Sequence, residues 1–302
     1  MSDGATLEVW VFTGDGDGWV TLADGSRRWG LYGASGLLLH SVDESGTGHV
    51  LLQHRAPWTH QGGTWGLPGG ARNSGESLIE AALREFTEEV EGELGVLSLF
   101  GVHRQDYQVW AFDTVLADTA ERRPFAPGNS ESQSIRWVPV HEVPSLPLIP
   151  AFAQVWPELS AALSERLLLV VDATGPEQDS APVEPLRDGL AALVRAGVTD
   201  DVLPSGLSLA PLYRRFPDVL VVVDARARVT APASVPGVEV VPVFEDAAAA
   251  IARLTRRHAA RVRVVVASDD PEVRSRSAAA GAHPVPASWA SGLATAGMEL
   301  SG

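Results

Sequence analysis

Three glutamates lie close together in the sequence, at Glu85, Glu88 and Glu89. On a helix, residues three and four apart share a face, so these carboxylates would crowd together. Like charges at this spacing destabilise a helix by roughly 0.2–0.5 kcal/mol per pair. A divalent cation would remove the repulsion, and carboxylate oxygens suit Mg²⁺ or Mn²⁺, which also coordinate phosphates. The spacing therefore indicates a metal site, with a solvated helix face as the alternative.

The element that must position these glutamates is a helix from about Glu76 to Glu91. Apolar side chains recur there at helical spacing and define a buried face, opposite the carboxylates. They are Leu78, Ile79, Ala82, Leu83, Phe86 and Val90. A glycine-dense segment from Gly62 to Gly70 leads the chain into this helix.

The same stretch resembles the signature of Nudix hydrolases, Gly-x5-Glu-x7-Arg-Glu-U-x-Glu-Glu-x-Gly-U, in which U is a bulky apolar residue. Leu67-Pro68-Gly69-Gly70 is followed by Glu76 and then by Arg84-Glu85-Phe86-Thr87-Glu88-Glu89. One position departs from the pattern, because Val90 is followed by Glu91 and then Gly92. The end of the helix is therefore expected to shift by one residue, beyond all three glutamates.

The resemblance implies an α/β/α sandwich with a mixed sheet that cleaves the diphosphate linkage of a nucleoside diphosphate derivative by attack of water on phosphorus. It assigns Glu85, Glu88, Glu89 and the backbone carbonyl of Gly70 as ligands of Mg²⁺ or Mn²⁺. Glu76 and Arg84 are then supporting residues, with Arg84 holding the glutamates in position.

The general base stays open among Glu88, Glu89 and Glu131, the last of which could equally be an ordinary loop residue. Glu131 lies in a polar loop from Asp118 to Ser132, which is long enough to be functional. Three residues are candidates for substrate binding, each with a structural alternative. Arg55 could bind a phosphate or form a surface ion pair, and Trp58 could stack on a base or pack against the protein. Tyr107 could line the pocket or only one face of the sheet.

Two domains are expected in 302 residues. The first would include a hairpin formed by the apolar runs Gly36–His40 and His49–His54, and would close with a helix over Ala151–Leu163. We place the boundary near Ser164, which gives a first domain at 1–164 and a second at 165–302.

The second half alternates apolar runs with Ala-rich helical segments, which is typical of a smaller, doubly wound α/β domain with a mainly parallel sheet. Its three strongest runs end near Asp172, Asp224 and Asp269, so these carboxylates are expected at one sheet edge. The runs Val221–Asp224 and Val266–Asp269 resemble those of PIN or NYN-type nucleases. The Asn after the first Asp and the carboxylates of a later helix are missing, which favours a degenerate binding or oligomerisation domain over an active nuclease.

Composition narrows the classes of function. The net charge is −15, and residues 1–164 carry 9 Arg against 21 Asp and Glu, so a broad nucleic-acid or membrane surface is not expected. RNA contact could involve only the second half, where Arg214-Arg215 and Arg256-Arg257 are interpreted as solvated helix ends. Cys and Lys are absent, which excludes disulfides, thiolate nucleophiles and P-loop lysine chemistry.

No N-terminal targeting segment or membrane span is evident, so a cytoplasmic protein with a small-molecule substrate is expected. A second hypothesis is a regulator that senses a nucleotide without turning it over and whose C-terminal domain binds RNA or a protein. The intact glutamate set favours the hydrolase. The sequence indicates neither the substrate nor the oligomeric state.

Overall fold

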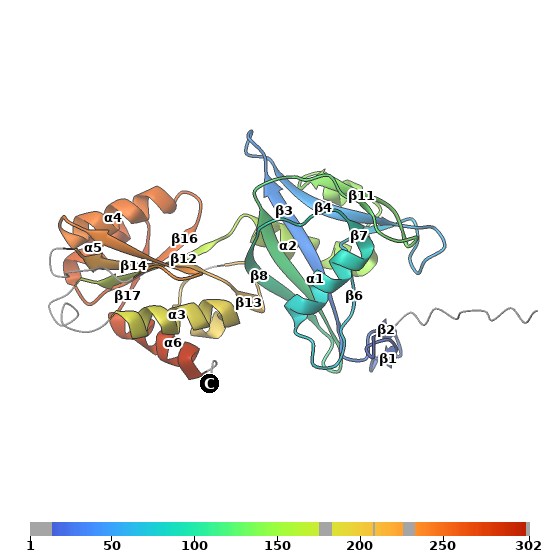
Figure 1. The fold of residues 1–302 in the computed structure, drawn as a ribbon, viewed down its shortest axis with the longest axis horizontal. Helices are drawn as coiled ribbons and strands as arrows, with labels where there is room; N and C mark the ends of the chain where they lie inside the picture. The colour runs from blue at the N-terminus through green and yellow to red at the C-terminus, as the bar shows by residue number, and fades with distance from the viewer. Residues whose placement is uncertain (1–13, 175–182, 208, 226–232, 300–302) are drawn as a thin grey trace, which may run out of the picture.

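The computed structural model describes residues 14–174, 183–207, 209–225 and 233–299. Two lobes lie side by side, each built around its own sheet (Figure 1). The sheet of the first lobe has eight strands and that of the second lobe has five. No helix within the described ranges has the length and apolar character needed to cross a membrane.

The first sheet is mixed, as expected. Its main path runs β11-β4-β3-β9-β8-β13, and β5 and β6 pair with β4 and β3. The pair β3–β9 is parallel and the other pairs are antiparallel. The strands are β3 (Ala34–Val42), β4 (Gly48–Arg55), β5 (Trp65–Gly66), β6 (Gly69–Ala71), β8 (Leu97–Asp106), β9 (Ala111–Thr119), β11 (Ser132–Pro139) and β13 (Arg214–Arg215).

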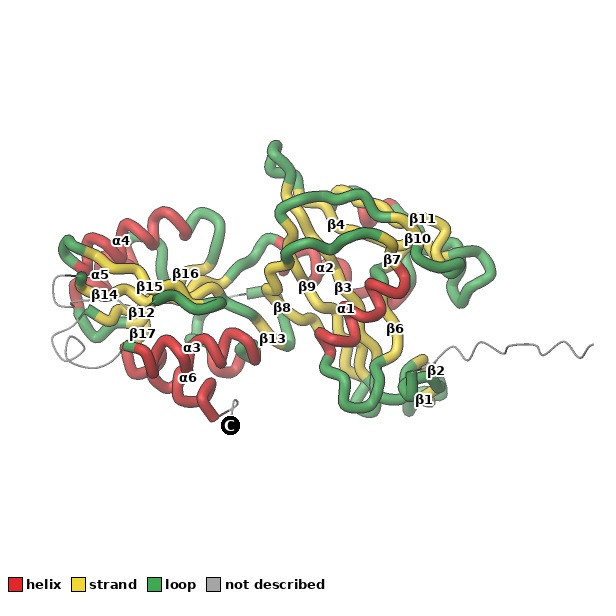
Figure 2. Tube along the Cα trace, viewed as in Figure 1, coloured by secondary structure: helices red, strands yellow, loops and turns green. Residues whose placement is uncertain are grey.

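One helix covers each face of this sheet (Figure 2). α1 (Leu78–Glu89) packs Ala82 and Phe86 onto one face, and α2 (Pro150–Leu163) packs on the other. Because successive strand residues point to opposite faces, Leu37 and Leu39 contact the α1 core while Leu38 contacts the α2 core. The short helix η1 (Val143–Ser145) precedes α2.

Two small two-stranded sheets complete the first lobe. β1 (Trp19–Thr21) pairs with β2 (Arg27–Trp29), and β7 (Val90–Glu91) pairs with β10 (Ala126–Pro127). β10 divides the segment that the sequence suggested to be one loop. The predicted hairpin is confirmed by β3 and β4.

The second lobe is a parallel sheet in the order β15-β14-β12-β16-β17, which confirms the predicted doubly wound class. α3 and α6 cover one face, and α4 and α5 cover the other (Figure 1). The elements are β12 (Leu167–Ala173), α3 (Glu184–Ala196), η2 (Asp200–Val202), β14 (Asp218–Asp224), β15 (Val238–Val243), α4 (Ala247–His258), β16 (Arg263–Ala267), α5 (Pro271–Ala279), β17 (His283–Val285) and α6 (Ala287–Glu299).

One prediction about local structure is wrong. Arg214 and Arg215 are not a solvated helix end, because they form β13, which pairs with β8 of the first lobe. The side chain of Arg215 is buried and donates to Asp200 at 2.9 Å. Tyr107 lies in the turn between β8 and β9, in which Gln108 has a φ of 70°.

Candidate active site

The helix that carries the glutamates begins and ends within the signature. Ser77 caps it: its hydroxyl accepts from the backbone N–H of Glu80, and the Glu80 carboxylate accepts from the N–H of Ser77. The helix ends at Glu89, and Val90 is already extended. Gly92 then turns the chain with a φ of 139°. The residues that depart from the family pattern therefore lie in and just after β7, beyond the last glutamate.

Arg84 is the centre of the cluster. Its Nε and Nη2 donate to the two carboxylate oxygens of Glu76 at 2.8 and 2.9 Å, and its Nη1 donates to Glu85 at 2.8 Å and to Glu88 at 3.3 Å. Nη2 also donates to the carbonyl of Ala71 at 2.8 Å. One guanidinium thus offsets the repulsion of three carboxylates and ties the helix to the preceding loop. Its hydrogen bonds lower the pKa of Glu76.

Glu89 is the buried member of the cluster. Glu89 is 6% exposed, and its Oε2 accepts from the backbone N–H of Gly69 at 2.8 Å. Burial raises the pKa of Glu89 to about 7 and also raises that of Glu85. At Gly70, a Cβ atom would lie 2.4 Å from a carboxylate oxygen of Glu85. A side chain at this position would therefore displace the Glu85 carboxylate from the backbone of Gly70.

The donor chemistry of these residues fits a hard divalent cation. Two carboxylates that burial penalises when charged lie beside a glycine backbone, and a cation would relieve that penalty. Within the described residues, no three His, Asp or Glu side chains are grouped closely enough to hold a metal. The contacts explain this, because Arg84 engages Glu85 and Glu88 while Glu89 faces Gly69.

The predicted residues outside the helix fall into two groups. Arg55 ends β4, and Trp58 and Glu131 lie on the segments that follow β4 and precede β11. These segments meet where the backbone N–H of Ala56 donates to the carbonyl of Glu131 at 2.8 Å. Arg55 donates through Nε to the carbonyl of His60 at 3.0 Å and lies close enough to Glu89 to influence its charge. Trp58 is 74% exposed, and Glu131 is also exposed.

Tyr107 does not join this group. It packs in a small cluster with Val20, Leu22, Ala34 and Trp110, between the β1–β2 hairpin and the β8–β9 turn. The ring of Trp110 lies 5.9 Å from that of Tyr107. Substrate binding by Tyr107 stays a prediction, and the structure places this side chain in the cluster with Val20 and Trp110.

The sequence analysis missed Gln53, a polar side chain that is 1% exposed on β4. It donates to the hydroxyl of Ser132 at 2.6 Å and lies near Glu89, whose carboxylate it helps to keep ionised. A glutamine directly after the apolar run 50–52, within the same strand, was the available signal. The N-terminal hairpin was also missed as a neighbour of the site: Asp15 accepts from Ser74 in the signature loop, and Trp19 lies 6.3 Å from His60.

In the second lobe, Asp172, Asp224 and Asp269 lie at the predicted edge, at or just after the ends of the parallel strands β12, β14 and β16. Asp172 is buried and accepts from the backbone and hydroxyl of Thr174 and from the hydroxyl of Ser268, at 2.6–3.1 Å. Asp269 accepts from the backbone N–H of Ala287 at 3.0 Å. These bonds organise the ends of the strands and the start of α6. Within the described residues, no group of acidic side chains at this edge is arranged to hold a metal.

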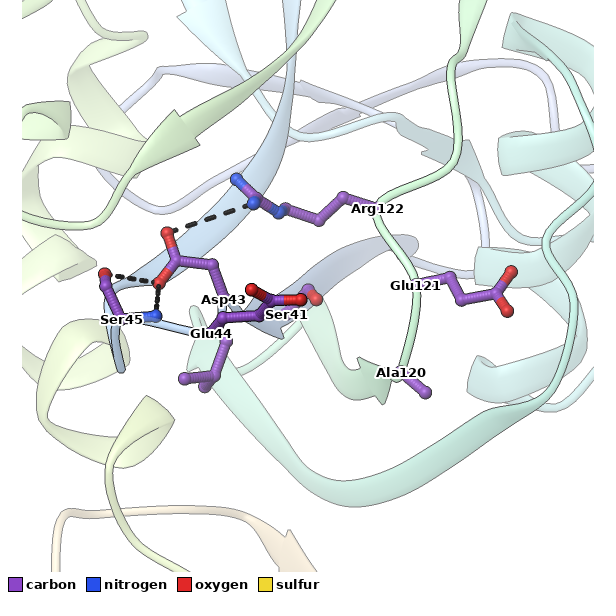
Figure 3. A pocket seen from close by; sticks show the side chains of 8 residues that line it. Ser41, Asp43, Glu44, Ser45, Ala120, Glu121 and Arg122 are labelled. Carbon is purple, nitrogen blue, oxygen red and sulfur yellow. Dashed lines mark hydrogen bonds and ion pairs between the residues drawn. The ribbon is translucent and has the colours of Figure 1, made fainter.

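Neither of two surface cavities contains a signature residue. A cavity of about 580 Å³ lies beside the β3–β4 loop, where Asp43 accepts from Ser45 and faces Arg122 (Figure 3). A second, of about 530 Å³, lies between the lobes and is lined by Asp118, Arg166 and Asp218 among others. Both are separate from the glutamate cluster.

Comparison with known proteins agrees with this geometry. The family model described as the NUDIX domain matches residues 38–159. A Mycobacterium tuberculosis protein named "Putative 8-oxo-dGTP diphosphatase 3" is 48% identical over 158 residues, which cover 49% of this chain and 71% of the relative. A nucleoside triphosphate pyrophosphatase/Nudix hydrolase fusion protein of Bifidobacterium longum is 45% identical over 154 residues, which cover 50% of this chain and 32% of the relative.

Among solved structures, a Nudix hydrolase from M. smegmatis, RenU, is 44% identical, with a TM-score of 0.45 over 48% of this chain and 92% of that one. The chain belongs to the Nudix hydrolase family. Its first half is a Nudix pyrophosphohydrolase domain, and the matched residues contain the whole glutamate cluster.

Proposed function

We propose that this chain hydrolyses a nucleoside triphosphate by attack of water on phosphorus, with Mg²⁺ or Mn²⁺ as cofactor and an oxidised guanine nucleotide as the first substrate to test. The observation that carries the proposal is the arrangement of Glu85 and Glu89 beside Gly69 and Gly70, held by Arg84. The choice of nucleotide rests on the printed name of the mycobacterial relative.

Glu85, Glu88, Glu89 and the carbonyl of Gly70 are the residues that would hold the metal. When bound, Mg²⁺ neutralises charge on phosphate oxygens and makes a bound water more acidic. Arg84 fixes two of these carboxylates and remains cationic, since its contacts with Glu76 and Glu85 raise its pKa. The burial of Glu89 keeps water out of its surroundings, which strengthens its interaction with a cation.

Residues around the cluster would bind the phosphate and the base and would activate the water in this proposal. Arg55 would bind a phosphate, because its guanidinium has N–H donors beyond the Nε that donates to His60. Trp58 offers an exposed ring on which a purine could stack. Glu131 and Glu88 are the candidate bases outside the buried part of the cluster, since both are exposed. We also propose that the Nudix domain and the C-terminal α/β domain divide near Ser164.

The test is metal-dependent product release from a panel of 8-oxo-dGTP, dGTP, ADP-ribose, a dinucleoside polyphosphate and a nucleotide sugar. Wild type is compared with Glu88→Gln, Glu131→Gln and the control Glu91→Gln, which changes an exposed glutamate of β7. We expect one substrate class to be turned over, a loss of about 10²-fold or more in Glu88→Gln, and a change under about twofold in the control.

The Glu131 variant assigns the base. A loss of about 10²-fold in Glu131→Gln together with a flattened acid limb of the pH–rate profile would identify Glu131 as the base. A near-normal rate would return the role to Glu88 or Glu89. If no substrate is turned over while a nucleotide still binds, the hydrolase proposal fails and the nucleotide sensor takes its place.

A further inference from the structure

A segment of the second half, residues 210–216, completes the sheet of the Nudix lobe. The backbone N–H of Tyr213 donates to the carbonyl of Val102 at 2.7 Å, and that of Phe216 donates to Phe100 at 3.1 Å. Leu212 enters the core on the α2 side, whereas Tyr213 and Phe216 pack on the α1 side. This segment therefore belongs to both cores of the first lobe, although it follows β12 in the chain.

Tyr213 contacts a charged group rather than only apolar side chains. The guanidinium carbon of Arg104 lies 3.5 Å from the centre of the Tyr213 ring, which is a close cation–π contact. Arg104 donates through Nε and Nη2 to the two oxygens of Asp113, at 2.7 and 2.9 Å. Asp113 and then Tyr213 raise the pKa of Arg104. Asp113 is fully buried, and Arg104 engages both oxygens of its carboxylate.

The contacts continue from Asp113 to the signature loop. Arg72 lies between Gly70 and Glu76, and its Nη1 is 3.8 Å from Asp113. Its Nη2 donates to the backbone carbonyl of Glu76 at 3.0 Å, and its Nε is buried without a hydrogen-bond partner. Arg72 is therefore held mainly by charge and by one backbone contact. Glu76 in turn binds Arg84 through both oxygens, which completes the path to the glutamates.

We propose that Tyr213 is a positioning residue for the Nudix site: it orders Arg104, which holds Asp113 toward Arg72 and so fixes the loop 72–76 that joins β6, which contains Gly70, to the helix of the glutamates. The inference builds on the proposed function, because it concerns the same site. It gives the second half of the chain a role in forming that site, through a segment that lies beyond the residues matched by the family model.

The test uses the full chain with Tyr213→Ala, Tyr213→Phe and the matched control Leu212→Ala. Leu212 is the neighbouring residue on the opposite face of the sheet, so its loss should lower stability without touching Arg104. Mn²⁺ binding is measured from the electron paramagnetic resonance signal of free Mn²⁺, alongside kcat, KM and the unfolding temperature.

We expect Tyr213→Ala to weaken Mn²⁺ binding and lower kcat by about 3- to 10-fold, the range of a partly desolvated cation–π contact, with KM little changed. Tyr213→Phe keeps the ring and should stay within about twofold of wild type. Leu212→Ala should unfold at a lower temperature yet bind Mn²⁺ as wild type does. In the variant that combines Tyr213→Ala with Arg104→Met, the loss should not exceed that of Arg104→Met alone.

Equal losses in Leu212→Ala and Tyr213→Ala, a loss in Tyr213→Phe as large as in Tyr213→Ala, or additive losses in the double variant would each overturn the proposal. Wild-type Mn²⁺ binding separates this inference from the proposed function. If wild type binds Mn²⁺ with the expected pattern among variants but hydrolyses no nucleotide, only the proposed function fails.

Discussion

Two buried carboxylates, Glu89 in the first lobe and Asp172 in the second, differ in how their surroundings satisfy them. In the second lobe, buried Asp172 accepts three hydrogen bonds from Thr174 and Ser268, which satisfies its charge locally. In the first lobe, buried Glu89 accepts from the backbone of Gly69, and burial raises its pKa to about 7. A buried carboxylate whose charged form is penalised by burial is typical of a functional site. A buried carboxylate with several hydrogen-bond donors is typical of a structural role.

The largest expected effect tests this contrast directly with two isosteric changes. Glu89→Gln should lower kcat by about 10²-fold or more, because it removes a charged oxygen from the proposed metal set, while its free energy of unfolding should stay the same or rise. Asp172→Asn should lower the free energy of unfolding by about 1–2 kcal/mol and leave kcat within about twofold. Nucleotide hydrolysis and urea unfolding of both variants measure the two effects.

The contrast breaks if the effects are reversed. A stable Asp172→Asn variant with strongly reduced hydrolysis would mean that the second-lobe edge takes part in the reaction. A Glu89→Gln variant that unfolds easily but retains kcat would make Glu89 a structural residue like Asp172.

A smaller effect is expected at Arg84, which acts on the carboxylates rather than on the substrate. Without its guanidinium, Glu76, Glu85 and Glu88 repel one another and the carbonyl of Ala71 loses a donor. Arg84→Gln should therefore reduce kcat/KM by about 10- to 100-fold. Arg84→Lys should restore only part of this, because one ammonium cannot reproduce the fork that binds both oxygens of Glu76. Full activity in either variant would show that the glutamates do not need this contact.

The same comparison explains what the sequence could predict. The helix α1, the β3–β4 hairpin and the parallel second sheet depend on local periodicity, so residue spacing was enough to predict them. β13 has only two residues, and its partner β8 is more than a hundred residues away, so no local pattern marks it. The pair Arg104–Asp113 and the position of Tyr107 also depend on how strands meet. The glutamate positions followed from the motif, whereas their partners required the fold.

The smallest expected effect concerns the cavity where the lobes meet. It is lined by Asp118 and Asp218, whose pKa values shift in opposite directions. Burial alone would raise the pKa of Asp118, but its contacts with His40 and Arg166 outweigh burial and lower it. Asp218, across the cavity, has a pKa raised by burial, and Arg166 and His258 only partly oppose this. Asp118 therefore stabilises the fold above the ordinary Asp pKa, and Asp218 destabilises it there.

The sign of each effect gives a pH test by urea unfolding. The stability that Asp118 supplies is lost as pH falls through its lowered folded pKa, so Asp118→Asn should cost about 1 kcal/mol at neutral pH and progressively less as pH falls through that pKa. The protonated form of Asp218 is the favoured one, so its contribution is complete at low pH and is lost as pH rises through its raised folded pKa. Asp218→Asn should therefore raise stability at neutral pH by a few tenths of a kcal/mol, roughly, and this gain should vanish in acid. Parallel pH profiles for wild type and both variants would mean that neither carboxylate is coupled to the contact between the lobes.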